Sequence, residues 1–241
     1  MQSLYKSAFT EHGVKKTPLG FTAAFLLLTT VLFSSFSPAA MPVGPATPSN
    51  LIATTISNTR IDLAWTDNAG DETGFKLEVK LGAGGTYSQI ANLGANVTSY
   101  SSTGLDAGTD YFYRVRAYNA GGNSAFSNEA GATTLPDPPS APSALAATAV
   151  SNSQINLAWS DNASNESGYN VERKLTSAVT YTLIATLGPN TTSYASTGLA
   201  ADKAYSFRVY AYNSGGSSGY SNVASATTLP NPPVAPSALA A

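Results

Sequence analysis

Short stretches in which every second residue is apolar run through most of the chain. Ile61, Leu63 and Trp65 alternate with more polar residues, and the same alternation recurs at 75–79 and 111–117. A period of two places the apolar side chains on one face of an extended strand and the polar ones on the other. The pattern therefore predicts β-strands with one buried face.

The pattern is duplicated with a fixed step of 94 residues. Pro48 recurs as Pro142 and again as Pro236, and Trp65 recurs as Trp159. No insertion or deletion is needed, and more than half of the positions are identical between the two copies. A period of this length is typical of one complete small domain per copy rather than the fractional unit of a solenoid.

Each copy holds seven apolar segments separated by turn residues, and none shows sustained helical periodicity. In the first copy they begin near Leu51, Ile61, Phe75, Tyr87, Thr98, Tyr111 and Ala125. Seven short strands in about 90 residues is typical of two packed antiparallel sheets. The sequence thus predicts an all-β protein with two tandem, seven-stranded, immunoglobulin-like sandwiches.

The later strands of each copy carry a motif that resembles the fibronectin type III signature. The first copy reads Tyr111-x-Tyr113-Arg114-Val115-x-Ala117-Tyr118-Asn119, and the second reads Tyr205-x-Phe207-Arg208-Val209-x-Ala211-Tyr212-Asn213. The resemblance covers residues 48–134 and 142–228. It implies that the two tryptophans fill the core and that Tyr111 and Tyr205 form tyrosine corners, with Leu105 and Leu199 packed beneath them. One departure is Asp202-Lys203, where the first copy has Gly108-Thr109.

The first forty residues have the features of an export signal. Three lysines precede a largely apolar run over residues 19–36, and the small residues Ser37, Ala39 and Ala40 follow it. This order predicts a cleaved signal peptide, which would be helical; an uncleaved membrane anchor is the alternative, because 18 apolar residues lie near the lower limit for a span. Either reading places the repeats outside the cytoplasm.

Composition excludes several kinds of chemistry from the repeats. The chain has no cysteine, and its one histidine, His12, lies in the leader. Without residues 1–40 the chain keeps 9 basic and 13 acidic side chains. Cys–His and Ser–His–Asp catalysis and Cys/His zinc sites are therefore not available. The net negative charge and the scattered basic residues do not favour nucleic acid.

The remaining candidate sites have simple structural explanations. The oxygen-rich loop 67–72 lacks the spacing of a helix-loop-helix calcium site, and Asp and Asn favour such turns by bonding the local backbone. The carboxylates sit outward on strands, as Asp62 and Glu78 do, or in turns, as Asp106 does, and nothing apolar near them in the sequence would raise a pKa. We therefore predict no catalytic, cofactor-binding or metal-binding residues.

Outward aromatic residues leave one binding hypothesis open. Phe112, Tyr118, Tyr212 and Tyr220 face away from the predicted core and could stack on sugars. The alternative, which we favour, is that they form cross-strand pairs on a solvated face. No Arg-Gly-Asp triplet occurs in the chain, so the sequence gives no support for integrin-type adhesion.

These observations predict an extracellular, non-catalytic and monomeric array. We expect a signal or anchor at 1–40, domains at 45–135 and 142–229, a proline-rich linker at 136–141, and a second linker with the start of a third repeat at 230–241. Its expected role is that of a spacer and interaction module of a secreted or surface protein. The alternatives are an adhesin module that binds carbohydrate or a partner protein, and an accessory region of a polysaccharide-degrading enzyme. The membrane would be contacted only through an uncleaved leader.

Overall fold

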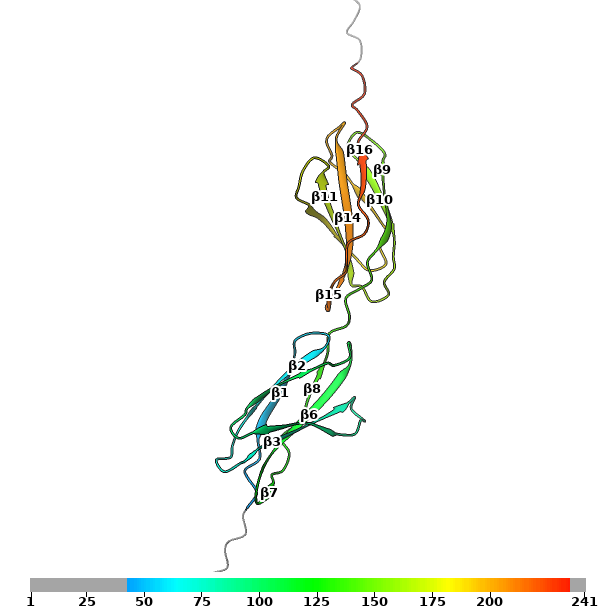
Figure 1. Ribbon diagram of the computed structural model, residues 1–241. Helices are drawn as coiled ribbons and strands as arrows, with labels where there is room; N and C mark the ends of the chain where they lie inside the picture. The colour runs from blue at the N-terminus through cyan, green and yellow to red at the C-terminus, as the bar shows by residue number, and fades with distance from the viewer. Residues whose placement is uncertain (1–42, 235–241) are drawn as a thin grey trace, which may run out of the picture. The chain divides into compact units, whose positions relative to one another are not determined.

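The computed structural model describes residues 43–234, which fold into two domains of the same architecture (Figure 1). The first domain contains β1 (Ser49–Thr55), β2 (Arg60–Thr66), β3 (Gly74–Leu81), β4 (Ser88–Gly94), β5 (Ser99–Thr103), β6 (Asp110–Asn119), β7 (Gly122–Asn123) and β8 (Ala130–Thr133). The second contains β9 (Ser143–Ala149), β10 (Ile155–Ser160), β11 (Gly168–Leu175), β12 (Thr182–Leu187), β13 (Ser193–Ser196), β14 (Ala204–Asn213), β15 (Gly216–Ser217) and β16 (Ala224–Thr227).

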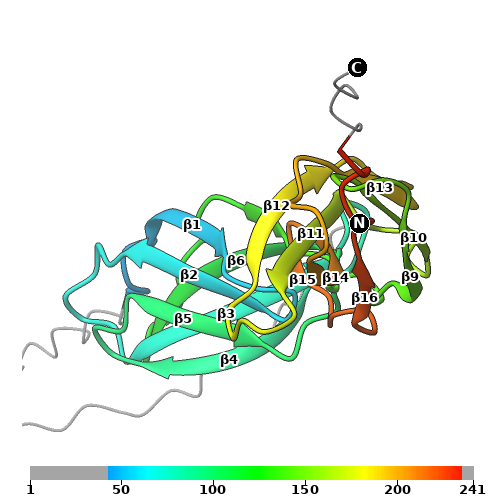
Figure 2. The ribbon, with the colours of Figure 1, turned by 90° about the horizontal axis from the view of Figure 1, so that it is seen from above.

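Two antiparallel sheets face each other in each domain. In the first domain one sheet has the order β1-β2-β5, and the other has the order β4-β3-β6-β7 with β8 also paired to β6 (Figure 2). The second domain repeats this arrangement with β9-β10-β13 and β12-β11-β14-β15, and β16 pairs with β14. The prediction of two immunoglobulin-like sandwiches is confirmed for the described residues. The predicted helical leader at 1–40 lies outside them.

The core of each domain consists of the inward residues of both sheets, as the alternation predicts. Trp65 and Trp159 are each only 5% exposed, and they pack at 5.8 Å between ring centroids against Phe75 and Tyr169, respectively. The two cores share no residue among those described. Each domain therefore has its own apolar core, as an independently folding unit requires.

The predicted tyrosine corners are present in both domains. The ring of Tyr111 is buried, and its hydroxyl accepts a hydrogen bond from the main-chain N–H of Asp106 at 3.0 Å. Tyr205 makes the same bond with Ala200 at 3.1 Å. The hydroxyl satisfies a partly buried backbone donor five residues upstream, so the corner fixes the approach to β6 and β14.

The first strand of each domain contains a bulge where its register with the next strand shifts. Asn50 and its counterpart Ala144 have φ of 54° and 53°, a left-handed conformation that Asn tolerates better than Ala. The peptide groups of the following leucine, Leu51, both bond the side chain of Asn128, at 2.9 and 2.8 Å. Asn222 does the same for the leucine of the second domain. An amide side chain thus replaces a strand partner at the bulge.

The predicted seventh strand, beginning near Ala125, was wrong in its position. Residues 124–129 lie outside the strands, and β8 begins only at Ala130. The hydroxyls of Ser124 and Ser127 accept bonds from the main-chain N–H groups of β6, at 3.0 and 3.2 Å. These side chains take the place of a regular ladder, and apolar alternation alone cannot reveal that substitution.

Candidate functional site

The outer face of the β4-β3-β6 sheet carries a cluster of stacked cations and aromatic rings in the first domain. The guanidinium of Arg114 lies between two rings, 3.9 Å from the centroid of Tyr87 and 3.7 Å from that of Phe126. Arg116 also lies over Phe126, at 4.5 Å. A guanidinium attracts the negative face of an aromatic ring, so each contact stabilises the closed stack. We call this group, with the acid beneath it, the cation–aromatic cluster.

Glu78 holds the cluster in place from the neighbouring strand. It lies directly opposite Arg114 in the β3–β6 register and accepts bonds from that guanidinium at 2.8 and 2.6 Å. Arg116 donates to its other oxygen at 3.3 Å. Glu78 is therefore only 8% exposed, although it occupies an outward strand position. A buried carboxylate that accepts two guanidinium groups acts as a structural ion pair.

The second domain repeats the cluster with different rings. Arg208 lies 4.2 Å from the centroid of Tyr181 and 3.7 Å from that of Tyr220, and Glu172 accepts its Nε–H at 2.6 Å. Tyr210 meets Tyr220 edge to face, with centroids 5.2 Å apart and planes at 82°. The glutamate and the arginine are identical in both copies, whereas Phe126 is exchanged for a tyrosine. The stack is thus retained while its rings change.

An acidic group extends the cluster only in the first domain. Glu129 accepts hydrogen bonds from the hydroxyl of Tyr87 and an ion pair from Lys80 at 2.8 Å. These two donors, Lys80 first, hold the pKa of Glu129 below its ordinary value. Burial, followed by the bond to Glu129, raises the pKa of Tyr87. Neither shift brings a proton transfer into the neutral range, so the group serves charge pairing rather than acid–base catalysis.

The structure confirms the cross-strand pairing expected for three of the outward aromatic residues. Phe112 covers Gly131, where an added Cβ would lie only 2.7 Å from the ring. Tyr118 covers Gly74 in the same way, and Tyr212 covers Gly168. A ring laid over a cross-strand glycine replaces the missing side-chain contact. Tyr220 is the most exposed of the four, at 47%, and one of its faces holds Arg208.

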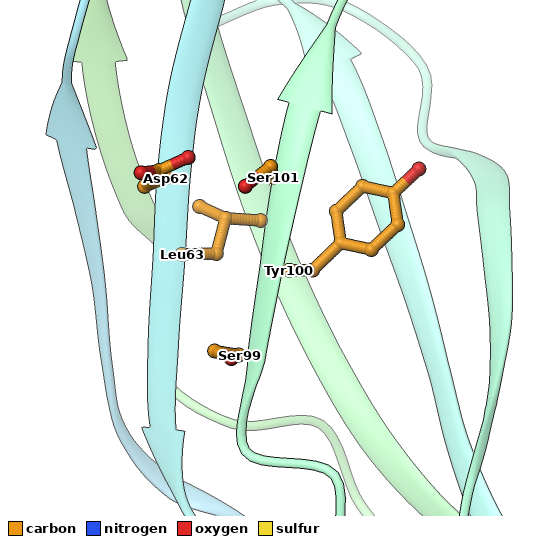
Figure 3. Close-up of a pocket in the computed structure, with 5 residues that line it drawn as sticks. All are labelled: Asp62, Leu63, Ser99, Tyr100 and Ser101. Atoms are coloured by element: carbon orange, nitrogen blue, oxygen red, sulfur yellow. The ribbon is translucent and has the colours of Figure 1, made fainter.

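A polar hollow lies on the opposite sheet, between β2 and β5 (Figure 3). The side chains of Asp62 and Ser101 lie side by side in it, and the Tyr100 ring is directed away from them (Figure 3). Arg60 donates to both oxygens of Asp62 at 2.7 Å, and these bonds lower the pKa of that carboxyl group. The same place in the second domain is lined by neutral groups, including Asn156. The carboxylate of the hollow is therefore already paired, and it is not repeated.

The oxygen-rich loop after β2 has the turn chemistry that the sequence predicts. Asp67 Oδ1 accepts the main-chain N–H of Ala69 at 2.9 Å, and Asp161 makes the same bond with Ala163 in the second domain. Among residues 43–234 no group of three or more His, Cys, Asp or Glu side chains could hold a metal ion. No helix within that range is long and apolar enough to cross a membrane.

The arginine stacks were missed from the sequence, although a signal for them was present. Glu78 and Arg114 recur unchanged as Glu172 and Arg208, on facing positions of neighbouring strands. Two opposite charges that recur together on outward positions predict a cross-strand ion pair. The rings that complete each stack come from irregular segments, which strand alternation does not place.

Comparison with known proteins agrees with this geometry. The chain is 36% identical over 199 residues to Chitinase A1 of Niallia circulans, which covers 76% of the chain and 26% of that protein. It is 33% identical over 196 residues to Exoglucanase B of Cellulomonas fimi, covering 76% of the chain and 17% of the relative. The chain thus spans about a quarter or less of the length of these relatives.

Solved structures and family profiles agree on the fold. The FN1–FN3 domains of chicken CNTN1 match with a TM-score of 0.53 and 19% identity, covering 78% of this chain and 66% of that one. The family described as Fibronectin type III domain matches residues 46–133 and 140–227. Two matches cover most of the chain and coincide with the two sandwiches. The chain therefore belongs to the fibronectin type III family, as a tandem of two such domains.

Proposed function

We propose that the chain is a non-catalytic extracellular array that serves as a spacer and accessory region of a larger protein. The observation that carries the proposal is the closed cation–aromatic cluster in both domains. Arg114 and Arg208 each occupy the space between two rings, on the sheet face where aromatic side chains could otherwise receive a sugar. A ligand would have to displace a guanidinium that also bonds a carboxylate, so stacking there is disfavoured.

The comparisons support the accessory part of the proposal. The relatives named above are a chitinase and an exoglucanase, and this chain corresponds to a minor part of each. A tandem module in such proteins is available to separate other parts of the polypeptide. The extracellular location is supported by the leader-like residues 1–40. The absence of histidine and cysteine from the repeats supports a role without catalysis.

The proposal is tested by retention on insoluble polysaccharides and by activity assays. The purified chain is mixed with chitin and with microcrystalline cellulose, and the bound fraction is compared with that of Arg208→Ala, which opens the faces of Tyr181 and Tyr220. We expect no retention of the unmodified chain and no release of reducing sugar. Retention that Tyr220→Ala abolishes would instead establish the carbohydrate-binding alternative. Hydrolysis by the chain alone would refute the absence of catalysis.

A further inference from the structure

The segment that leads into each domain is bonded to that domain at one repeated position. In the first domain Asn119 Nδ2 donates to the carbonyl oxygen of Val43 at 3.2 Å. In the second, Asn213 Nδ2 donates to the carbonyl oxygen of Asp137 at 2.8 Å, and Asn165 Nδ2 donates to the same oxygen at 2.9 Å. Val43 and Asp137 are one period apart, so the same main-chain group is the first anchored point of both domains.

Close packing confirms that this lead-in belongs to the domain that follows it. Pro139 is buried, as is its counterpart Pro45 in the first domain. Gly215, in the turn between β14 and β15, lies so near the lead-in that an added Cβ would be 1.8 Å from the carbonyl oxygen of Pro136. Only glycine allows this approach, because any side chain would push the segment away.

The segment that leaves each domain is also bonded at a repeated position, and that position is again residue 137. Asn58 Nδ2 of the first domain donates to the side chain of Asp137 at 2.8 Å. Asn152 Nδ2 of the second domain donates to Oδ1 of Asn231 at 3.0 Å. The preceding leucine in each exit, Leu135 in the first domain, is held by the main chain at 3.2 Å. The exit of a domain is thus ordered up to the side chain of its residue 137 or 231.

We propose that Asp137 is a structural member of both domains: its carboxylate completes the first and its carbonyl group begins the second. No freely rotating linker residue then remains between them, and the period of 94 residues is a unit that shares its end residue with its neighbour. Pro136 and Pro138 flank Asp137, and their rings fix φ on both sides. The proposal concerns chain mechanics and holds whatever the array separates or binds.

The shared residue makes Asp137 and Asn231 chemically similar but mechanically different. Both accept a side-chain amide from the domain that precedes them. Only Asp137 also has a described domain after it, bonded to its carbonyl group. Substituting Asp137 by Ala removes the bond to the first domain and leaves that carbonyl in place. Asn231→Ala removes the matching bond at the end of the second domain and serves as the control.

The test is ¹⁵N relaxation of the full chain, which reports the rotational tumbling of each domain separately. We expect both domains of the unmodified chain to share one anisotropic tumbling tensor, and Asn231→Ala to leave it unchanged. Asp137→Ala should reduce the difference in tumbling anisotropy from that of two independent domains by at least half. Insertion of two glycines after Asp137 should abolish the shared tensor. Hydrogen exchange near Asn58 should become about three- to tenfold faster in Asp137→Ala, since one exposed bond is lost.

Two results would overturn the proposal. The first is independent tumbling of the two domains in the unmodified chain, each at the rate of a free domain of about 90 residues. The second is equal behaviour of Asp137→Ala and Asn231→Ala in relaxation. A loss of folding is recognised separately in both variants, because it would broaden or shift the core amide signals of Val115 and Val209.

Discussion

The two domains solve one packing problem in two ways, and exchanging the solutions tests the cross-strand account. In the first domain Phe112 lies over Gly131. The matching positions in the second domain are Ser206 and Ser225, whose hydroxyls are 2.8 Å apart. Each pair is complementary, whereas a mixture of the two is not. The substitutions Phe112→Ser and Gly131→Ser should therefore be non-additive.

The magnitudes follow from the geometry. In Gly131→Ser the new Cβ would lie 2.7 Å from Cε1 of Phe112, and overpacking of this kind costs about 1–3 kcal/mol. Phe112→Ser removes a half-buried ring that also lies 5.1 Å from Lys80 Nζ, a loss of about 1–2 kcal/mol. The double substitution removes the clash and gains a hydroxyl pair of about 0.5–1.5 kcal/mol. We expect a favourable coupling free energy of at least about 1 kcal/mol.

The measurement is native-state hydrogen exchange of the full chain, followed by NMR. The slowest amides of β6 report the free energy of unfolding of the first domain, and those of β14 report the second as an internal control. A coupling of about 1 kcal/mol corresponds to a fivefold deficit in exchange rate relative to the additive expectation. Additivity of the two substitutions within 0.3–0.5 kcal/mol would refute the proposed complementarity.

Three further predictions concern single positions. Because hydrogen bonds lower the pKa values of Asp62 and Glu129, their contribution to stability is complete above the ordinary carboxyl pKa values and is lost as the pH falls through the lowered ones; acid titration should thus destabilise the first domain more than the second, which has neutral residues at both places. Tyr205→Phe should lower the unfolding free energy of the second domain by about 1–3 kcal/mol in denaturant titrations, because a partly buried N–H loses its acceptor; a change below 0.3 kcal/mol would show that the corner is not stabilising. Ala144→Asn should raise the stability of that domain by about 0.5–1 kcal/mol, since Asn50 fits the same left-handed conformation, and an unchanged midpoint would contradict the strain.

Much of the fold was predictable because inward positions obey a simple rule. Trp65, Tyr111 and their counterparts are buried as the alternation and the resemblance indicate. The rule fails where a side chain has two characters. Glu78 occupies an outward position yet is nearly inaccessible, since Arg114 and Arg116 cover it. Burial by a neighbouring side chain depends on three-dimensional stacking, which a period of two does not contain.

Differences between the copies were equally hard to predict. Arg173 replaces Val79 at an inward position of β11, where a charge is not expected. In the structure its guanidinium reaches the edge of the core and donates to the buried hydroxyl of Ser196 at 3.1 Å. The long aliphatic stem permits this, because it packs as an apolar group while the head finds a polar partner. The expectation of no catalytic or ligand-binding residues remains a prediction.

The central claim is that the aromatic faces of both domains are closed by their own arginines and are offered to no ligand. The most direct test observes the Nε–Hε signals of Arg114 and Arg208 by NMR while chito-oligosaccharides or cello-oligosaccharides are added in excess. The account predicts that both signals keep their positions throughout the titration. A saturable shift of the Arg208 signal, absent in Tyr220→Ala, would show that the stack opens to receive a sugar and would contradict the account.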